Sequence, residues 1–361
     1  MNGEWIEKEA KAYLNSVRRE ILGIEPHELS RSVLDLVKKN EAWIDNECVN
    51  LYAATNLMSP LVRRLLSSSI ATRVAEGHVG AKHQRGVKYL ERIEAYAIEL
   101  TKRLFKAEFA ECRVLSGSMA NNIIFSALTE PGDTILSLNV PSGGHISYQK
   151  FGVAGLRRLK IRELPFNNER LNVDVEKLKR VAEEVKPKLI VLGASLILFP
   201  YPIEEIRRTA DQVGASIHYD GAHVLGLIAG GKFQDPLTEG ADSLSGSTYK
   251  TFAGPPGGLI LCNSEDLAEK IDKATFPGMT ANIHYNRLAG LVIATLELLE
   301  FGEDYASQTV SNAKALAKHL YNLGFNVLGR DYGFTQSHQI AVDASNIGGG
   351  RKASLILEKA N

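Results

Sequence analysis

Three short segments of this chain carry side chains whose types and spacing could do chemistry. The first, S-G-S-M-A-N at residues 116–121, follows an apolar run and opens a helical pattern. Gly117 lets the backbone turn sharply, and the hydroxyls of Ser116 and Ser118 join the N–H groups of a helix start as donors to an anion. The segment therefore predicts a phosphate site, although an ordinary strand-to-helix turn with a serine cap fits it too.

The second segment is H-Y-D-G-A-H at residues 218–223. An aspartate that leaves the carboxyl end of a parallel strand points into the ligand crevice of an α/β sheet, so Asp220 is a candidate ligand contact and His223 lies about one turn beyond it. An aspartate turn and a hydrogen-bonded core histidine are the alternatives.

The third segment is S-G-S-T-Y-K-T-F-A-G-P-P-G-G at residues 245–258, where hydroxyl residues surround a single lysine. A partly desolvated lysine with hydroxyls nearby is the environment of a Schiff-base lysine, while a lone lysine is more often a solvated charge. The residues concerned are Lys250 and its neighbours Ser247, Thr248 and Thr251.

In this order on one α/β domain, the three segments match the needs of pyridoxal 5'-phosphate. The phosphate needs donors, the pyridinium nitrogen needs a carboxylate and the aldehyde needs an amine. Lys250 would form the Schiff base. Asp220 would keep the ring nitrogen protonated, so that the ring accepts electrons from a carbanion at the α-carbon of an amino-acid substrate.

The elements that position these segments follow from a pattern of short apolar runs separated by helical stretches. Such alternation predicts βαβ crossovers and a mostly parallel sheet buried on both faces, with ligands at the carboxyl ends of its strands. The predicted strands are residues 112–115, 134–138, 189–192, 216–220 and 258–262.

Three parts are predicted along the chain. Residues 1–60 form an N-terminal helical segment, with helices over 5–21 and 32–51 and with Ser30 as a cap of the second. Residues 61–285 form the large cofactor-binding α/β domain. Residues 286–361 form part of a smaller α+β domain, which begins with a helix pair over 286–324, continues with strands in F-N-V-L and H-Q-I-A-V-D, and ends with a helix over 352–360.

Composition limits the class of protein. The 361 residues carry 42 Lys and Arg against 42 Asp and Glu, so no net field attracts nucleic acid or an anionic membrane, and we expect neither as a partner. No apolar run approaches the roughly 18 residues that span a bilayer, and the charged N-terminus is unlike a secretory signal. Cys48, Cys112 and Cys262 are scattered, which argues against metal sites and disulfides and favours a reducing cytoplasm.

Several motifs together make the chain resemble serine hydroxymethyltransferases, particularly the archaeal ones, from about residue 40 onward. They are A-E-G at 75–77, S-G-S-M-A-N, P-S-G-G-H-I-S at 141–147, G-A-S at 193–195, Y-D-G-A-H-V-L-G-L-I-A-G at 219–230, G-S-T-Y-K-T-F-A-G-P-P-G-G and F-T-Q-S-H-Q at 334–339. The resemblance implies the aspartate-aminotransferase-like fold (fold type I) and interconversion of L-serine and glycine. The one-carbon unit would pass to a tetrahydropterin, either tetrahydrofolate or tetrahydromethanopterin.

The resemblance also implies residue roles. Lys250 is the Schiff-base lysine, Asp220 the pyridinium partner and Glu76 the acid/base carboxylate beside the substrate hydroxyl, for which a plain surface glutamate is the alternative. His145 would stack on the cofactor ring, and Tyr249 stands where the family has a histidine before the lysine. The other expected cofactor contacts are Ser195 and His223 at the phenolic oxygen, Ser116, Gly117 and Ser118 at the phosphate, and Gly257 and Gly258 at the phosphate of a neighbouring subunit. The last role implies a homodimer with a shared active site.

The sequence also departs from the family pattern. Val74, His83 and Gln84 replace tyrosine or aromatic positions around A-E-G, and Ala54 replaces a serine that helps bind the substrate carboxylate. The family's carboxylate-binding arginine lies beyond Asn361, and the abrupt final helix favours a truncated copy.

The missing arginine leaves two further possibilities open. Arg85 or Arg73 could bind the carboxylate, or the substrate differs. The alternatives for the function are a paralogue that performs a retro-aldol or transaldol reaction on another β-hydroxy amino acid, and a catalytically silent family member that acts as a binding or regulatory subunit.

Overall fold

A computed structural model describes residues 5–361. These residues form two compact units. The larger unit consists of residues 53–344 and contains the predicted cofactor positions; the other joins residues 5–52 to residues 345–361. The predicted boundaries at 60 and 285 both fall inside the larger unit, and the three-part division stays a prediction.

The smaller unit is helical. It contains α1 (Lys8–Ile21), α2 (Pro26–Ala42), the π-helical turn η1 (Trp43–Glu47), the 3₁₀ turn η6 (Ser345–Ile347) and α12 (Gly350–Glu358). The predicted first and last helices are confirmed, but the second lies earlier than predicted, over Pro26–Ala42 and the turn to Glu47 rather than over 32–51, and Ser30 as its cap is wrong. The helix begins at Pro26, whose missing N–H costs nothing in the first turn, and the Ser30 hydroxyl instead donates to the Pro26 carbonyl one turn earlier (3.0 Å).

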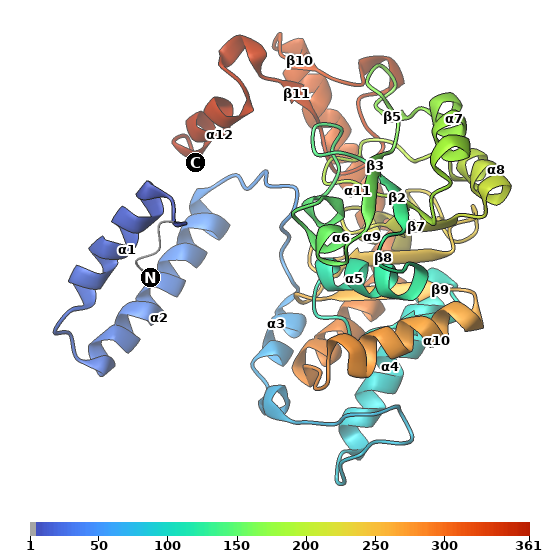
Figure 1. Ribbon diagram of the computed structural model, residues 1–361. Coiled ribbons are helices and arrows are strands. Elements are labelled where there is room, and N and C mark those ends of the chain that lie inside the picture. The colour runs from blue at the N-terminus through green and yellow to red at the C-terminus, as the bar shows by residue number, and fades with distance from the viewer. Residues whose placement is uncertain (1–4) are drawn as a thin grey trace. The chain divides into compact units, whose positions relative to one another are not determined.

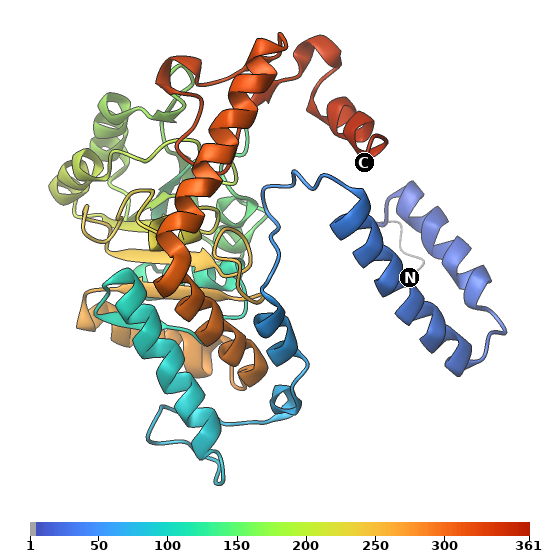
Figure 2. The ribbon, with the colours of Figure 1, turned by 180° about the vertical axis from the view of Figure 1, so that it is seen from behind.

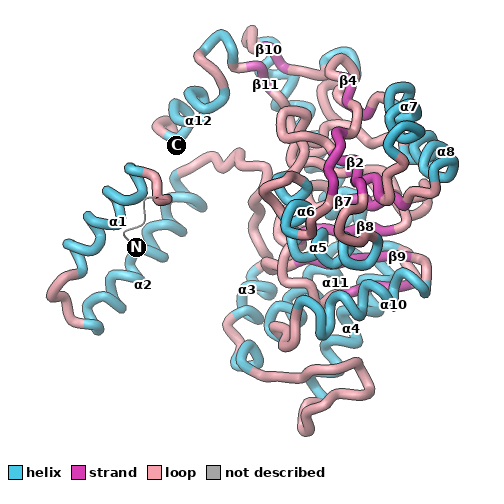
Figure 3. Tube along the Cα trace, viewed as in Figure 1, coloured by secondary structure: helices cyan, strands magenta, loops and turns pink. Residues whose placement is uncertain are grey.

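A seven-stranded sheet forms the centre of the larger unit (Figure 3). Its strand order is β1-β9-β8-β7-β6-β2-β3, in which β8, β7, β6, β2 and β3 run parallel and β9 and β1 run antiparallel to their neighbours. The strands are β1 (Phe109–Glu111), β2 (Thr134–Ser137), β3 (Lys160–Glu163), β6 (Leu189–Leu192), β7 (Ser216–Asp220), β8 (Ser243–Ser247) and β9 (Gly258–Cys262).

Most predicted strands are confirmed, namely those at 134–138, 189–192, 216–220 and 258–262. The strand predicted at 112–115 is wrong. Phe109–Glu111 pairs with β9 instead, and Val114 accepts a bond from the Gly258 N–H (3.0 Å) just before the chain turns into a helix. Strand β8 was missed because three of its five residues are serines; it is nevertheless fully buried, and Ser243 and Ser245 hydrogen-bond to His218 of β7.

Helices cover both faces of the sheet (Figure 1). They are α3 (Pro60–Leu66), α4 (Lys88–Phe105), α5 (Gly117–Leu128), α6 (Val153–Leu156), α7 (Val175–Val185), α8 (Ile203–Val213), α9 (Leu225–Ala229), α10 (Glu265–Lys273) and α11 (Tyr285–Asn322). Short turns and strands complete the unit: η2 (Ser69–Thr72), η3 (Ile146–Tyr148), η4 (Ala274–Met279), η5 (Arg330–Tyr332), β4 (Phe166–Asn167), β5 (Asn172–Val173), β10 (Asn326–Val327) and β11 (Val342–Asp343).

The helix pair predicted over 286–324 is wrong, because α11 is one helix of 38 residues that packs along α3 and α4 (Figure 2). Its glycines do not break it. Gly302 lies against Gly230, where the close approach of the two backbones leaves no room for a Cβ on Gly230. The strands predicted after it are confirmed as the short pair β10 and β11.

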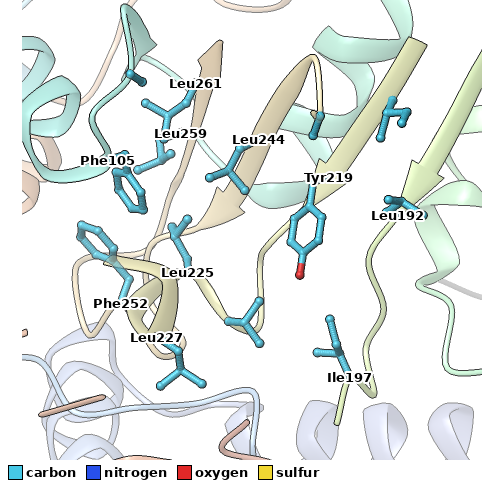
Figure 4. Close-up of a cluster of buried hydrophobic side chains, with 14 of the residues drawn as sticks. Phe105, Leu192, Ile197, Tyr219, Leu225, Leu227, Leu244, Phe252, Leu259 and Leu261 are labelled. Atoms are coloured by element: carbon cyan, nitrogen blue, oxygen red, sulfur yellow. The ribbon is translucent and has the colours of Figure 1, made fainter. Parts of the chain in front are cut away.

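The core beside the sheet holds the strand ends in place (Figure 4). Tyr219 of β7 and Leu244 of β8 are buried side by side, and beyond them the Phe105 and Phe252 rings stack with centroids 6.3 Å apart. This packing fixes the positions from which Asp220 and the loop after β8 leave the sheet. Among residues 5–361, no helix is both long and apolar enough to cross a membrane.

Candidate active site

Most of the predicted cofactor residues line one pocket at the carboxyl ends of β7 and β8. The lining residues are Ser116, Gly117, Ser118, Asn121, His145, Tyr148, Ala194, Asp220, Ala222, His223, Ser247, Tyr249 and Lys250. A larger hollow of about 390 Å³ lies between α4, β1 and α10. In that hollow Arg113 already pairs with Glu111 and Asp272, and none of the predicted cofactor residues lines it, so the smaller pocket is the candidate site.

Asp220, the last residue of β7, is buried and held as a carboxylate. Its Oδ2 accepts hydrogen bonds from Asn121 Nδ2 (2.8 Å) and the Tyr148 hydroxyl, and its Oδ1 accepts one from the Ala222 N–H (2.9 Å). Burial raises the pKa of Asp220, but these hydrogen bonds outweigh it and hold the pKa below its ordinary value. The carboxylate is therefore charged at neutral pH.

Asn121 and Tyr148 are site residues that the sequence analysis missed. Both are buried, and each contributes one hydrogen bond to Asp220. Asn121 closes the S-G-S-M-A-N segment, where an amide on the buried face of a helix needs a polar partner. That requirement is the signal that could have found it. Tyr148, three residues after His145, carried no comparable signal.

Lys250 lies in the turn after β8 and is 8% exposed. Burial lowers the pKa of its amine, and the charge of Asp220 opposes that effect. The carbonyl of Lys250 accepts a hydrogen bond from Asn56 Nδ2 (3.0 Å). The turn thus holds the amine at the edge of the pocket in an environment that favours its neutral, nucleophilic form.

The hydroxyl residues around Lys250 divide into two groups. Ser247 lines the pocket. Thr248 and Thr251 do not: their hydroxyls donate to the backbone carbonyls of Pro255 and His223 (2.5 and 2.7 Å). Of these three hydroxyls, only that of Ser247 is therefore placed to reach a phosphate in the pocket, and the two threonines brace the loop instead.

The expected phosphate side of the pocket is built at the start of α5. Ser116 caps this helix, with its Oγ accepting from the Met119 N–H (3.1 Å). A Cβ on Gly117 would lie 2.5 Å from Ser247 Oγ, and one on Gly258 would lie 2.8 Å from the Ser116 carbonyl oxygen. Only glycine allows this close approach, which leaves helix N–H groups and hydroxyls facing the pocket.

Two predicted histidines line the pocket in a form that burial keeps neutral. His145 Nδ1 lies 2.8 Å from Ser147 Oγ, and burial lowers the pKa of the ring. Burial, together with the charges of Lys250 and His338, lowers the pKa of His223 to about 3. Gln339 Nε2 donates to His223 Nδ1 (3.2 Å), so this ring nitrogen is an acceptor.

Ser195, Gly257 and Gly258 lie outside the pocket lining. The Ser195 carbonyl accepts from Gln339 Nε2 (2.7 Å), which links it to the partner of His223. Gly257 faces the buried Arg287, whose Nη1 would lie 2.7 Å from a Cβ on this glycine. The roles assigned to these three residues stay predictions.

Glu76 also lies outside the pocket lining, in the loop between η2 and α4. Its Oε2 accepts from Gln84 Nε2 (3.0 Å), while Gln84 Oε1 accepts from the Glu76 N–H (2.7 Å). Gln84, which departs from the family pattern, thus orients this carboxylate. Arg73 and Arg85, the two candidate carboxylate-binding residues, are exposed and do not line the pocket.

A serine hydroxymethyltransferase family model matches residues 27–361. The chain belongs to this family. Three of its relatives carry the name serine hydroxymethyltransferase. The Archaeoglobus fulgidus protein is 52% identical over 314 residues, covering 87% of this chain and 72% of the relative. The Methanocella arvoryzae protein is 48% identical, covering 92% and 78%, and the Pyrococcus abyssi protein is 45% identical, covering 91% and 78%.

The family has the predicted fold type I, and the mostly parallel seven-stranded sheet agrees with it. Membership implies pyridoxal phosphate and a folate-type co-substrate. The pocket fits the cofactor: it combines a buried amine, a carboxylate held charged and a glycine-lined helix start. Within residues 5–361, no group of three or more His, Cys, Asp or Glu side chains is arranged to hold a metal ion.

Proposed function

We propose that the protein is a pyridoxal-phosphate-dependent hydroxymethyltransferase that interconverts L-serine and glycine and transfers the one-carbon unit to a tetrahydropterin. The observation that carries the proposal is the meeting of Lys250, Asp220 and the Ser116 helix start in one pocket, in a chain of this family.

Lys250 would bind the aldehyde of pyridoxal phosphate covalently, since its lowered pKa favours the neutral amine. When bound, the cofactor supplies an electron sink for the substrate's α-carbon. Asp220 would hold a proton at the pyridine nitrogen, because its hydrogen bonds keep the carboxylate charged. Ser116, Gly117 and Ser118 would bind the phosphate, and the His145 ring would lie against the ring of the cofactor.

His223 and Ser195 would contact the phenolic oxygen side of the cofactor, and Tyr249 borders the same pocket as Lys250. Glu76 would move a proton at the substrate hydroxyl as the hydroxymethyl carbon leaves. Gln84 donates one hydrogen bond to this carboxylate and accepts another from the Glu76 N–H, and so would help to orient the carboxylate.

The proposal includes a homodimer in which Gly257 and Gly258 reach the phosphate of the neighbouring subunit. Within the smaller unit, α1 and α2 bury no residue and expose apolar side chains such as Val33 and Leu36, as expected of helices that a partner covers. A cytoplasmic location is also proposed, since the cysteines are free.

Substitutions at Val74, Ala54, Gln84 and Tyr249 motivate the first alternative, a paralogue acting on another β-hydroxy amino acid; the second alternative is a silent family member. Relatives named serine hydroxymethyltransferase at 45–52% identity do not favour either.

The test is glycine formation from L-serine by the purified protein loaded with pyridoxal phosphate, with tetrahydrofolate and tetrahydromethanopterin supplied in parallel. Activity with either pterin, absent in Lys250→Ala, is expected. The surface variant Lys102→Met serves as the matched loss of one lysine. If the protein binds the cofactor but forms glycine with neither pterin, the proposal is wrong. Aldehyde release from other β-hydroxy amino acids without pterin would then identify the paralogue.

A further inference from the structure

Glu94 is a carboxylate buried in the middle of α4. It is 2% exposed, and its Oε2 accepts hydrogen bonds from Lys82 Nζ (2.6 Å) and the Tyr285 hydroxyl (2.7 Å). The side chains of Lys82 and Glu94 are each 3% exposed. Removing two charges from water is costly for folding, and hydrophobic residues in their place would often give equal or greater stability. A role other than stability is therefore worth seeking for this pair.

Each of these two donors also lies within hydrogen-bond distance of a backbone carbonyl, and these carbonyls flank Glu76; the single proton of the Tyr285 hydroxyl is shared between Glu94 and its carbonyl. The Tyr285 hydroxyl lies 2.8 Å from the carbonyl oxygen of Ala75, and Lys82 Nζ donates to the carbonyl of Gly77. The two residues thus hold the peptide groups on either side of Glu76 and are themselves joined at one carboxylate.

The backbone between these two carbonyls has little freedom. Gly77 has a φ of +90°, which favours glycine, and a Cβ there would lie 3.0 Å from the Ala81 carbonyl oxygen. The Glu76 carbonyl accepts from the His83 N–H (3.0 Å). Ala75, Glu76 and Gly77 therefore each have their carbonyl oxygen bound, and the Glu76 side chain projects from a fixed stretch of backbone.

We propose that Glu94 is a positioning residue for Glu76: through Lys82 and Tyr285 it fixes the backbone that aims the Glu76 carboxylate at the substrate. This inference rests on the proposed function, because it assigns a purpose to the acid/base role of Glu76. Gln84 orients the side chain of Glu76. Lys82, Glu94 and Tyr285, which we call the Glu94 cluster, orient the peptide that carries it. A displacement of about 1 Å at a catalytic group can lower the rate of reaction about 100-fold.

The experiment removes the cluster without leaving an unpaired charge. In Lys82→Met/Glu94→Leu both charges are lost together, which is often neutral or favourable for folding. The Tyr285 hydroxyl keeps the Ala75 carbonyl as a partner, but Gly77 loses its donor. We expect kcat for glycine formation to fall about 10- to 100-fold with less than about a threefold change in KM for serine. Tyr285→Phe is the single-atom variant and should lower kcat in the same direction.

A double-mutant cycle separates positioning from general damage. In a Glu76→Gln background, Lys82→Met/Glu94→Leu should cause no further loss of kcat, because the group that the cluster positions is already removed. An equal loss of kcat with Glu76 present and with Glu76→Gln would overturn the inference. So would an unchanged kcat when the double substitution is made with Glu76 present. Wild-type activity in Glu76→Gln would overturn it together with the proposed role of Glu76.

A second measurement does not depend on catalysis. Hydrogen exchange of a peptide covering residues 75–86, measured on the protein without cofactor, should rise in Lys82→Met/Glu94→Leu and Tyr285→Phe. The matched control is Lys102→Met/Glu99→Gln, which removes an exposed ion pair from the same helix and should change neither exchange nor kcat. Unchanged exchange in both cluster variants would overturn the inference even if the enzyme uses another substrate.

Discussion

The hydrogen bond from Tyr148 to Asp220 offers a measurable account of how the site keeps its carboxylate charged. Tyr148→Phe removes only this donor and leaves the Asn121 and Ala222 bonds in place. A hydrogen bond to a charged group contributes about 1.5–3 kcal/mol, and one pKa unit corresponds to about 1.4 kcal/mol. The pKa of Asp220 in the folded protein should therefore rise by about 1–2 units in the variant.

The direction in which stability changes with pH follows from the linkage between protonation and folding. The pKa of Asp220 is lowered on folding, so its charge stabilises the fold above the unfolded pKa, and this stabilisation is lost as pH falls through the folded pKa. In Tyr148→Phe the folded pKa moves up, so the loss begins at higher pH and the variant is less stable than wild type by about 1.5–3 kcal/mol at pH 7. Urea unfolding of the cofactor-free protein at a series of pH values measures this difference.

Tyr201→Phe is the matched control, because Tyr201 is also a buried tyrosine near Asp220 but donates no hydrogen bond to it. The acid limb of its curve of unfolding free energy against pH should coincide with that of the wild type. The reasoning is refuted if Tyr148→Phe and Tyr201→Phe shift the acid limb equally, or if Tyr148→Phe lowers stability by the same amount at every pH. In the loaded enzyme, the acid limb of kcat/KM should move upward in Tyr148→Phe alone.

The remaining predictions concern the other side chains of the site. Lys250→Ala should abolish the visible absorbance of the bound cofactor while leaving the circular dichroism of the fold unchanged. Gly117→Ala should weaken cofactor binding at least about tenfold, since its Cβ would lie 2.5 Å from Ser247 Oγ; Gly117→Ala/Ser247→Gly should recover part of the affinity, measured by equilibrium dialysis. Gln84→Leu should lower kcat about tenfold with little change in cofactor affinity, because it removes the donor to Glu76 Oε2 and leaves the pocket unchanged. An equal kcat in the variant and the wild type would contradict the role of Gln84 in orienting the Glu76 carboxylate.

The sequence allowed prediction of the parts of the fold that local patterns determine. The buried parallel strand β6 is the continuous apolar run L-I-V-L, so its position was predicted to the residue. Strand β8 was not, because three of its five residues are serines, and two of them, Ser243 and Ser245, are buried with hydrogen bonds to His218 of the neighbouring strand. The break expected within 286–324 does not exist, because Gly302 is used for close packing against Gly230 rather than for a turn.

Within the site, motifs predicted the residues expected to contact the cofactor, but not the residues that support them. Asn121 and Tyr148 are 99 and 72 residues from Asp220 along the chain, and only the folded sheet brings them to its carboxylate. The Glu94 cluster is of the same kind: Lys82 and Tyr285 meet at one carboxylate although they are far apart in sequence. Supporting residues of this kind leave no periodicity or spacing to detect.

Burial of the histidines around Lys250 determines how the site responds to pH. Burial lowers the pKa of His223 to about 3 and of His218 and His338 to about 4, so none of these rings gains a proton near neutrality. In the unfolded chain each would bind a proton below about pH 6.5, so these histidines make the fold less stable as the pH falls below that value. A change in kcat between pH 6 and pH 8 cannot then arise from their protonation. Burial also lowers the pKa of the Lys250 amine, which makes this amine the first group to examine for a change in kcat with pH.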